Sequence, residues 1–322
     1  MRGARCWLSC LRGNGMRVKA ILNREGGTLA TADMPALVAH IEHSFGEHDH
    51  EIECEVTRSS SLMDALNAAG ENDHVDCIVA GGGDGTISAA AGIAWRYDKT
   101  LGVLPAGTMN LFAHSLQIPL NVHEAVSGIA RGKNVAVDIA TANGRPFVHQ
   151  YSVGFQAQAA QLRDKMKFGS RFGKMLASVK AVGMVIASPP SFECKICGDL
   201  PTQMPTRMSA VAVTNNIFGE GHMPYADKLD AGKLGVISTD PVSSLEAVRL
   251  AKDIMLGHWA ATDAINIANA TRIDLLFPRI GRRSKALLDG ELIDMEDRVE
   301  VRIHNGALNV LVPGDVEDRI TV

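Results

Sequence analysis

The sequence lacks any uninterrupted apolar run that approaches the roughly 20 residues a helix needs to cross a bilayer. Cysteine is sparse, and the six residues form no regular framework of pairs like that of secreted domains. The single C-x-x-C pair, Cys194 and Cys197, lies in a predicted strand, where the two thiols point to opposite faces and are poorly placed for zinc. These absences argue against a disulfide scaffold and a structural zinc site, and they favour free thiols in a reducing cytoplasm.

An excess of positive charge is missing too. Lys and Arg number 32 against 36 Asp and Glu, a formal net charge of -4, so the whole chain gives no reason to expect a nucleic-acid partner. With 322 residues, of which 46% are hydrophobic and 21% charged, the chain has an ordinary globular composition and is long enough for two domains. Residues 1–15 are rich in arginine, and their apolar core is too short for a secretory signal, so we predict a disordered extension there.

Residues 16–134 alternate predicted strands and helices. Apolar strands are predicted at 17–23, 51–56, 75–80 and 100–105, and each leads through a turn into a helical segment. Repeated units of this kind imply a parallel sheet covered by helices on both faces. Ligands bind beyond the carboxyl ends of the strands in such sheets. Three turns fall at those ends, "NREGG" at 23–27, "GGGDG" at 81–85 and "AGTMN" at 106–110, so we predict a binding site there.

The pattern changes after about Val135. Strand-like segments with hairpin punctuation dominate residues 135–305, interrupted by helical stretches around 156–186 and 245–259. The predicted fold is therefore an α/β N-terminal nucleotide-binding domain with a parallel sheet, over 16–134, plus a mainly antiparallel, β-rich second domain over 135–305. Residues 306–322 form a last strand and tail that fit either domain, including a return to the first.

The stretch "GGGDGT" has the character of an anion site. An apolar strand, a bare backbone and a helix N-terminus leave amides free to face a phosphate. Thr86 can cap the helix and also offer a hydroxyl, whereas the carboxylate of Asp84 suits phosphates only with a divalent cation between them, which indicates Mg-nucleotide chemistry. The lysine of the nucleotide-triphosphatase loop is missing, and Thr86 replaces the third glycine of the dinucleotide pattern. The alternative is a tight strand-to-helix turn without a ligand.

"GGGDGT" followed by "LPAGTMNLFAHSL" resembles the diacylglycerol kinase catalytic-domain family, which includes bacterial lipid kinases and sphingosine kinases. "ILNREGG", "DAGKLGV" and "LLDGE" extend the resemblance over roughly residues 16–313. It implies an ATP-binding first domain, a lipid-binding second domain, and ATP and Mg²⁺ as cofactors. The nucleotide-binding residues that it implies are Asn23, Thr57, Gly81, Gly82, Gly83, Asp84, Gly85, Thr86, Gly107, Thr108 and Asn110.

The resemblance also assigns catalytic and metal-binding roles. It points to Glu291 as the acceptor of the hydroxyl proton, supported by Asp289, although the residues alone read as a plain two-residue hairpin turn. Asp84 is a competitor for the base role, and we assign it to Mg²⁺ or phosphate. The family's structural metal site has an acid where this chain has Ala231, so Asp230 is the acid that remains for that role. Leu111 likewise replaces an acid of the family pattern.

The predicted function is an ATP-dependent lipid kinase that phosphorylates a hydroxyl of diacylglycerol or a related lipid. The alternatives are a kinase of a soluble small molecule, similar to NAD kinase, and a non-catalytic nucleotide-binding sensor. The predicted partner is a lipid substrate at the membrane surface, with a homodimer left open, and the predicted location is the cytoplasm and the inner membrane face.

A basic, apolar-studded stretch within 156–186 either lies on an anionic bilayer or is an ordinary amphipathic helix. The histidines His40, His43, His48 and His50 are predicted to be solvent-exposed rather than metal ligands.

Overall fold

The computed structural model describes residues 15–166, 171–200, 204, 206–219, 221–222, 225–255, 258, 262–279, 281, 284–314 and 316–321. Its contacts divide the chain into two compact units. Unit 1 is Met1–Val135 with Leu308–Glu317, and unit 2 is Ala136–Ala307 with Asp318–Val322. The extension predicted over 1–15 lies outside the described residues apart from Gly15, as do residues 167–170 of the basic stretch.

Unit 1 is built on a parallel sheet in the order β2-β1-β3-β4, and the C-terminal end of β17 (Arg298–Val312) lies parallel to β4. These strands are β1 (Arg17–Asn23), β2 (Glu51–Thr57), β3 (Cys77–Gly82) and β4 (Thr100–Pro105). Every residue of β3 and β4 is buried, as expected for the centre of a sheet covered on both faces.

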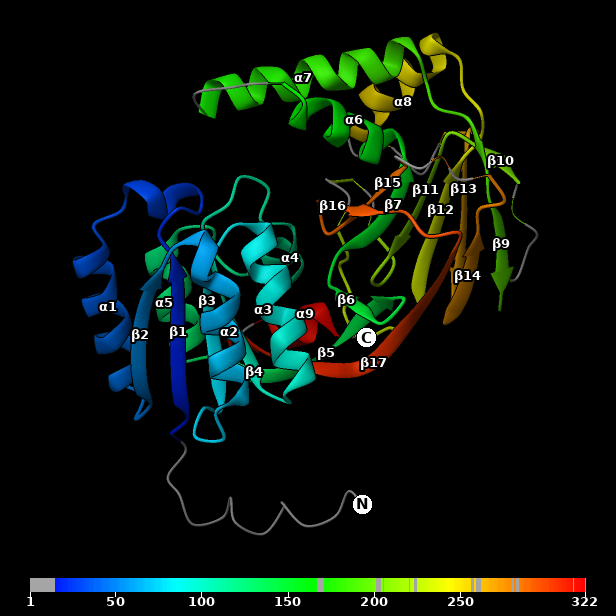
Figure 1. Cartoon of the computed structure of the whole chain (residues 1–322). Helices are drawn as coiled ribbons and strands as arrows, with labels where there is room; N and C mark the ends of the chain where they lie inside the picture. The colour runs from blue at the N-terminus through cyan, green and yellow to red at the C-terminus, as the bar shows by residue number, and fades with distance from the viewer. Residues whose placement is uncertain are drawn as a thin grey trace. The chain divides into compact units, whose positions relative to one another are not determined.

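Five helices accompany this sheet: α1 (Met34–Gly46), α2 (Leu62–Glu71), α3 (Asp84–Arg96), α4 (Leu111–Ser115) and α5 (Val122–Ala130). Helix α1 packs with α5, and α2 packs with α3 on the other face of the sheet (Figure 1). Short 3-10 turns, η2 (Gly27–Thr31) and η3 (Ser59–Ser61), follow β1 and β2. Asp33 caps α1 by accepting from Ala36 N, and Asn121 caps α5 in the same way, so the local sequence sets where these helices begin.

Unit 2 contains an antiparallel six-stranded sheet in the order β13-β12-β11-β7-β15-β16. Its strands are β7 (Gln150–Gly154), β11 (Ala210–Thr214), β12 (Leu234–Thr239), β13 (Ile265–Ala270), β15 (Lys285–Leu288) and β16 (Glu291–Asp294). One face packs into a buried apolar core shared with β14 (Arg272–Leu276), β9 (Lys195–Gly198) and the first part of β17. The opposite face carries α6 (Phe155–Asp164), α7 (Arg171–Ala187) and α8 (Ser244–Met255).

The remaining elements are short or pass from one unit to the other. Strand β5 (Lys133–Ala142) begins in unit 1 and pairs in unit 2 with β6 (Arg145–Phe147). Strands β8 (Phe192–Glu193) and β10 (Arg207–Met208) pair with each other, and α9 (Glu317–Ile320) ends the described chain. Of the C-terminal segment predicted over 306–322, residues 308–317 belong to unit 1 and 318–322 to unit 2.

The predicted fold class, a parallel α/β sheet followed by a mainly antiparallel β-rich part, is confirmed. Among the helices of the described residues, none combines the length and the apolar character needed to cross a membrane.

Candidate functional site

Three loops meet at the carboxyl edge of the parallel sheet in unit 1. They follow β1, β3 and β4 and comprise residues 23–28, 81–86 and 106–110, here called the loop cluster. Thr28 N donates to Ala106 O at 2.8 Å, and Ala106 N donates to Gly82 O at 2.8 Å, so the first and third loops bind each other and the second. Gly27 adopts φ +45, and a Cβ there would lie 1.6 Å from Ala106 O, so only glycine permits this approach.

The glycine turn at the start of α3 also depends on the absence of Cβ atoms. A Cβ on Gly82 would lie 2.5 Å from Thr86 Oγ1, and a Cβ on Gly107 would lie 2.9 Å from Gly83 Cα. No side chain caps α3 at Gly83, so the amides of its first turn keep their partial positive charge at the loop surface. A bare backbone at an uncapped helix N-terminus is suited to bind a phosphate.

Asp84 connects two of the loops through backbone amides. Its Oδ2 accepts from Asn110 N at 3.0 Å, and its Oδ1 accepts from Leu111 N at 2.7 Å. Leu111 therefore contributes its amide to this contact rather than an acidic side chain. The described residues contain no group of three or more His, Cys, Asp or Glu placed to hold a metal, so a cation at Asp84 would need phosphate or water oxygens as its other ligands. The role of Asp84 as a metal ligand stays a prediction, and its role in holding the loops was missed.

The other predicted nucleotide-binding side chains differ in what they are free to contact. Asn23 is buried, donates to Thr86 Oγ1 at 3.2 Å and accepts from Glu25 N at 3.1 Å. Asn110 has φ +49. Its Oδ1 accepts from Gly107 N at 2.7 Å, and its Nδ2 donates to Gly107 O at 3.1 Å. Thr57 is buried and donates to the carbonyl of the next residue, whereas Thr108 is exposed. Asn23, Asn110 and Thr57 thus shape the loops, and Thr108 faces solvent.

Two arginines, one within the loop cluster and one directly after β2, escaped the sequence analysis. Arg24 and Arg58 are both exposed, and their charges help to lower the pKa of Glu25, whose main stabilisation is a hydrogen bond from Ser59 N at 3.1 Å. Each arginine directly follows the carboxyl end of a parallel strand, which is the signal that would have found them. They bring positive charge to the edge where an anion would bind.

In unit 2 the "DGE" segment forms the hairpin turn between β15 and β16. Asp289 and Gly290 have φ +47 and +85, and Leu288 pairs with Glu291, which is a two-residue turn of the primed type. The buried Asp289 carboxylate accepts from Val148 N at 2.8 Å and from His149 N and Gln150 N, both at 2.9 Å. Asp289 therefore anchors the turn to β7, and this leaves Glu291 exposed at a fixed position at the start of β16.

Asp138 is a buried acid in β5 that the sequence analysis did not single out. Its carboxylate accepts from Gly232 N at 2.7 Å and Gly306 N at 2.8 Å. Burial raises its pKa, and the charge of the half-buried Asp230 adds to that rise. Asp230 thus lies near a second acid, but no third metal-ligating side chain joins them among the described residues, and its metal role remains a prediction. The signal for Asp138 was a single acid inside the apolar strand "VAVDIA".

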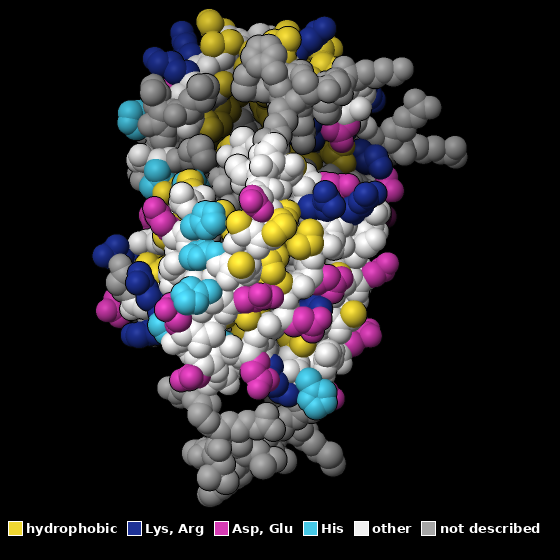
Figure 2. Space-filling model, turned by 90° about the vertical axis from the view of Figure 1, so that its left-hand side faces the viewer, with side chains coloured by type: hydrophobic (Ala, Val, Ile, Leu, Met, Phe, Trp, Pro, Cys, Tyr) yellow, Lys and Arg dark blue, Asp and Glu magenta, His cyan; other side chains and the backbone are white. Residues whose placement is uncertain are grey.

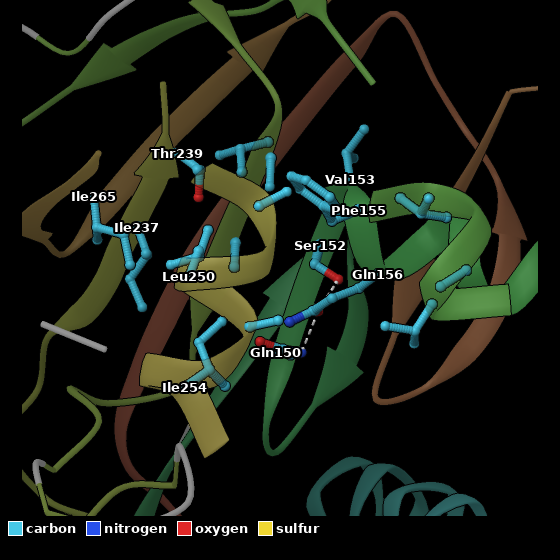
Figure 3. Close-up of a pocket in the computed structure, with 18 of the residues that line it drawn as sticks. Gln150, Ser152, Val153, Phe155, Gln156, Ile237, Thr239, Leu250, Ile254 and Ile265 are labelled. Carbon is cyan, nitrogen blue, oxygen red and sulfur yellow. Dashed lines mark hydrogen bonds between the residues drawn. The ribbon is translucent and has the colours of Figure 1, made fainter. Parts of the chain in front are cut away.

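An apolar cavity of about 250 Å³ lies between the antiparallel sheet of unit 2 and helices α6, α7 and α8 (Figure 3). Hydrocarbon side chains form most of its wall, among them Phe155, Ile237, Leu250, Ile254 and Ile265. Its polar side chains are Gln150, Ser152, Gln156 and Thr239. A concave, mostly apolar site with a few placed polar groups is typical of ligand pockets, and here the lining suits a hydrocarbon chain. Sequence reasoning did not locate this cavity.

Histidine side chains gather on the face of unit 1 that carries α1 (Figure 2). His43 and His48 are exposed as predicted, but His40 and His50 are half-buried, which corrects the prediction for these two. His40 Nε2 lies 3.2 Å from His123 O, and His50 Nε2 lies 3.2 Å from Ala130 O, so both rings bond α5 carbonyls. Burial lowers the pKa of His50. The His40 ring thus connects α1 to α5, and the His50 ring connects the segment before β2 to the end of α5.

Comparisons with known sequences agree with the loop motifs. Residues 17–142 match the model of the diacylglycerol kinase catalytic domain. An uncharacterized protein of Synechocystis sp. is 28% identical over 255 residues, which cover 76% of this chain and 56% of that protein. A Yersinia pestis (strain Pestoides F) protein named "Probable lipid kinase YegS-like" is 39% identical over 99 residues, 29% of this chain and 33% of that protein. The matched segments therefore span little more than half, or less, of these relatives.

Solved structures match over nearly the whole chain. A diacylglycerol kinase of Bacillus anthracis str. Sterne has a TM-score of 0.67 at 20% identity, covering 95% of this chain and 100% of that one. Another structure from the same organism reaches a TM-score of 0.73 at 20% identity, with 94% and 97% covered. At this identity the likeness establishes a shared fold. Residues 17–142 are thus similar to the catalytic domain of diacylglycerol kinases.

Proposed function

We propose that the protein is an ATP-dependent lipid kinase, which transfers the γ-phosphate of ATP to a hydroxyl of diacylglycerol or a related lipid. The observation that carries the proposal is the apolar cavity of unit 2, in a chain whose unit 1 contains the family's glycine-rich loop. A cavity lined almost entirely by hydrocarbon gains binding energy from acyl chains, whereas a small polar metabolite would leave it unfilled.

The loop cluster would bind the phosphates of ATP. Amides at the start of α3 face the phosphate oxygens, Thr108 offers a hydroxyl, and Arg24 and Arg58 add positive charge. Asp84 is the acid available to Mg²⁺, because each carboxylate oxygen that accepts one amide keeps a further lone pair. When bound, Mg²⁺ would supply charge neutralisation for the phosphate oxygens.

The acceptor side of the reaction is assigned to the hairpin of unit 2. The lipid hydroxyl oxygen forms a bond to the γ-phosphorus as the bond to the β,γ-bridging oxygen breaks, which releases ADP, and the hydroxyl proton passes to the Glu291 carboxylate. Asp289 is a positioning residue in this scheme, because its carboxylate is occupied by three backbone amides. Its contribution is to keep the turn, and with it Glu291, in one place.

The outer surface of α7 and α8 suits contact with a membrane. Leu176, Val179, Leu245 and Val248 are each more than half exposed, at 60%, 65%, 62% and 52%. Exposed Lys180, Arg249 and Lys252 lie on the same helices. Apolar side chains beside basic ones favour the surface of an anionic bilayer, where a lipid kinase would meet its substrate.

A kinase assay with the purified full chain tests the proposal. Radiolabelled Mg-ATP is offered with diacylglycerol and other lipid alcohols in mixed micelles and, separately, with NAD and soluble alcohols. We expect label in a lipid, and a 10²- to 10⁴-fold lower turnover for Glu291→Gln with unchanged ATP binding. Transfer to a soluble acceptor alone would overturn the lipid assignment. ATP binding without any transfer, equal in wild type and Glu291→Gln, would support a nucleotide sensor instead.

A further inference from the structure

Three polar side chains form a network on one side of the apolar cavity. Gln156 Oε1 accepts from Gln150 Nε2 at 2.7 Å and from Ser152 Oγ at 2.8 Å. Figure 3 shows these side chains meeting on β7 and the start of α6, away from Ile237 and Ile265 on the opposite wall. A shared acceptor of this kind fixes the orientation of both amides.

The local backbone explains why Gln156 reaches back over β7. Gly154 ends β7 with φ +97, a conformation that favours glycine, and α6 begins at the next residue. A Cβ on Gly154 would lie 2.2 Å from Ser209 O on the neighbouring segment, so the turn also needs a bare backbone. The reversal places the second residue of the helix above Ser152 of the strand.

The network leaves a donor and an acceptor for a ligand. Gln156 uses its Oε1 in both hydrogen bonds of the network, so the two N–H groups of its Nε2 remain for a ligand. Gln150 donates through its Nε2 and keeps its side-chain oxygen as an acceptor. Gln156 is exposed, and Gln150 is half-buried. One donor beside one acceptor is complementary to a hydroxyl group, or to a hydroxyl and an ester carbonyl together.

The uncharged lining of the cavity also favours a ligand with an uncharged head. Among the described residues that line it, none is Asp, Glu, Lys, Arg or His. An ammonium or carboxylate placed there would lose water without gaining an opposite charge, which is costly in an apolar site. An uncharged polar head would lose less solvation free energy. The hydrogen bonds that it makes to water outside the cavity are replaced by hydrogen bonds to the network.

We infer that Gln150, Ser152 and Gln156 make the cavity selective for lipids with an uncharged hydroxyl-bearing head, and that Gln156 determines this selectivity against long-chain amines and acids. The inference rests on the proposed function only in taking the cavity as the lipid site. The network also adjoins the "DGE" turn: Gln150 N donates to Asp289 Oδ1 at 2.9 Å, and Asp289 N donates to Gln150 O at 2.9 Å. A head held by Gln150 therefore lies on the strand that anchors the hairpin of Glu291.

A matched series of ligands tests the selectivity by binding alone. 1-Decanol, decylamine and decanoate share one chain and differ only in the head, which is neutral, cationic or anionic at pH 7.5. Isothermal titration of the full chain, without nucleotide and below the micelle concentrations, should show 1-decanol bound about 10-fold or more tighter than either ion. Gln156→Glu should reverse the order of 1-decanol and decylamine.

Gln161→Glu is the matched control. It makes the same charge change on the same helix α6 but lies outside the cavity lining, so it should keep the wild-type order. Equal binding of decylamine and 1-decanol to the wild type, or reversal by Gln161→Glu as well, would overturn the inference. Absence of binding by all three ligands would overturn it too. Selective binding with no kinase activity would sink the proposed function and leave the selectivity standing.

Discussion

The loop cluster of unit 1 and the cavity of unit 2 are built on opposite principles. The loop cluster depends on backbone: glycines whose absent Cβ atoms allow close approach, and side chains such as Asp84 that bond amides. The cavity depends on side chains drawn from four strands and three helices, most of them aliphatic and interchangeable in kind. A site of the first type tolerates few residue types, whereas a site of the second tolerates many.

This contrast predicts different responses to substitution. A single added methyl group should weaken nucleotide binding by the loop cluster, because the atoms packed against the bare backbone would have to move. A similar change in the cavity should only adjust which chain fits, because neighbouring aliphatic side chains can repack.

Gly82→Ala should have the largest effect on nucleotide binding. The new Cβ would lie 2.5 to 2.7 Å from three side-chain atoms of Thr86, which must move and lose the hydrogen bond from Asn23. Strain of about 1–3 kcal/mol is expected, equivalent to a loss of roughly 5- to 150-fold in ATP affinity. Equilibrium binding of a fluorescent ATP analogue measures it.

Gly46→Ala provides the control for that measurement. Nothing lies within 4 Å of a Cβ at Gly46, so the same chemical change should leave nucleotide affinity unaltered. If Gly82→Ala also bound the analogue normally, the loop cluster would tolerate side chains and the contrast with the cavity would fail.

The contrast also explains how much of the molecule could be predicted from the sequence. The parallel sheet and the glycine turn were predicted correctly, because buried strands read as continuous apolar runs and because close backbone contact demands glycine. The hairpin at Asp289 and Gly290 was equally readable, since two residues with positive φ favour an Asp-Gly pair.

The cavity and the tertiary roles of the polar residues were not readable. Gln150 and Gln156 look like ordinary surface residues until Gly154 reverses the chain and brings them together. Asp84 reads as a metal ligand because the amides of Asn110 and Leu111, which it binds, lie more than 20 residues away. Periodicity reports local burial, but it carries no information about which distant group a carboxylate will accept from.

Asp84→Asn should sharpen the comparison through stability in the absence of ligands. An amide in place of the carboxylate keeps one acceptor and turns an NH₂ toward a backbone N–H, so one of the two loop hydrogen bonds is lost. A charge-assisted hydrogen bond of this kind contributes about 1.5–3 kcal/mol. Chemical denaturation of the nucleotide-free protein should show a loss of that size. An unchanged free energy of unfolding, with Mg²⁺-dependent ATP binding alone impaired, would show that Asp84 acts only on the metal.

The smallest expected effect is a change in the pH dependence of stability, caused by the buried ring of His149 in unit 2. Burial lowers the pKa of His149 to about 4, and the ring stacks on Phe218 with centroids 4.9 Å apart. In the unfolded chain this histidine takes up a proton near pH 6.5, so between pH 6.5 and 4 the unfolded state binds more protons and stability falls as the pH falls. The slope contributed by one group is at most about 1.4 kcal/mol per pH unit.

Urea denaturation across this range should show a shallower slope for His149→Gln than for wild type, after allowance for His50 and His304, whose pKa values burial also lowers. Parallel slopes for the two proteins would mean that the His149 ring is hydrated in the folded state.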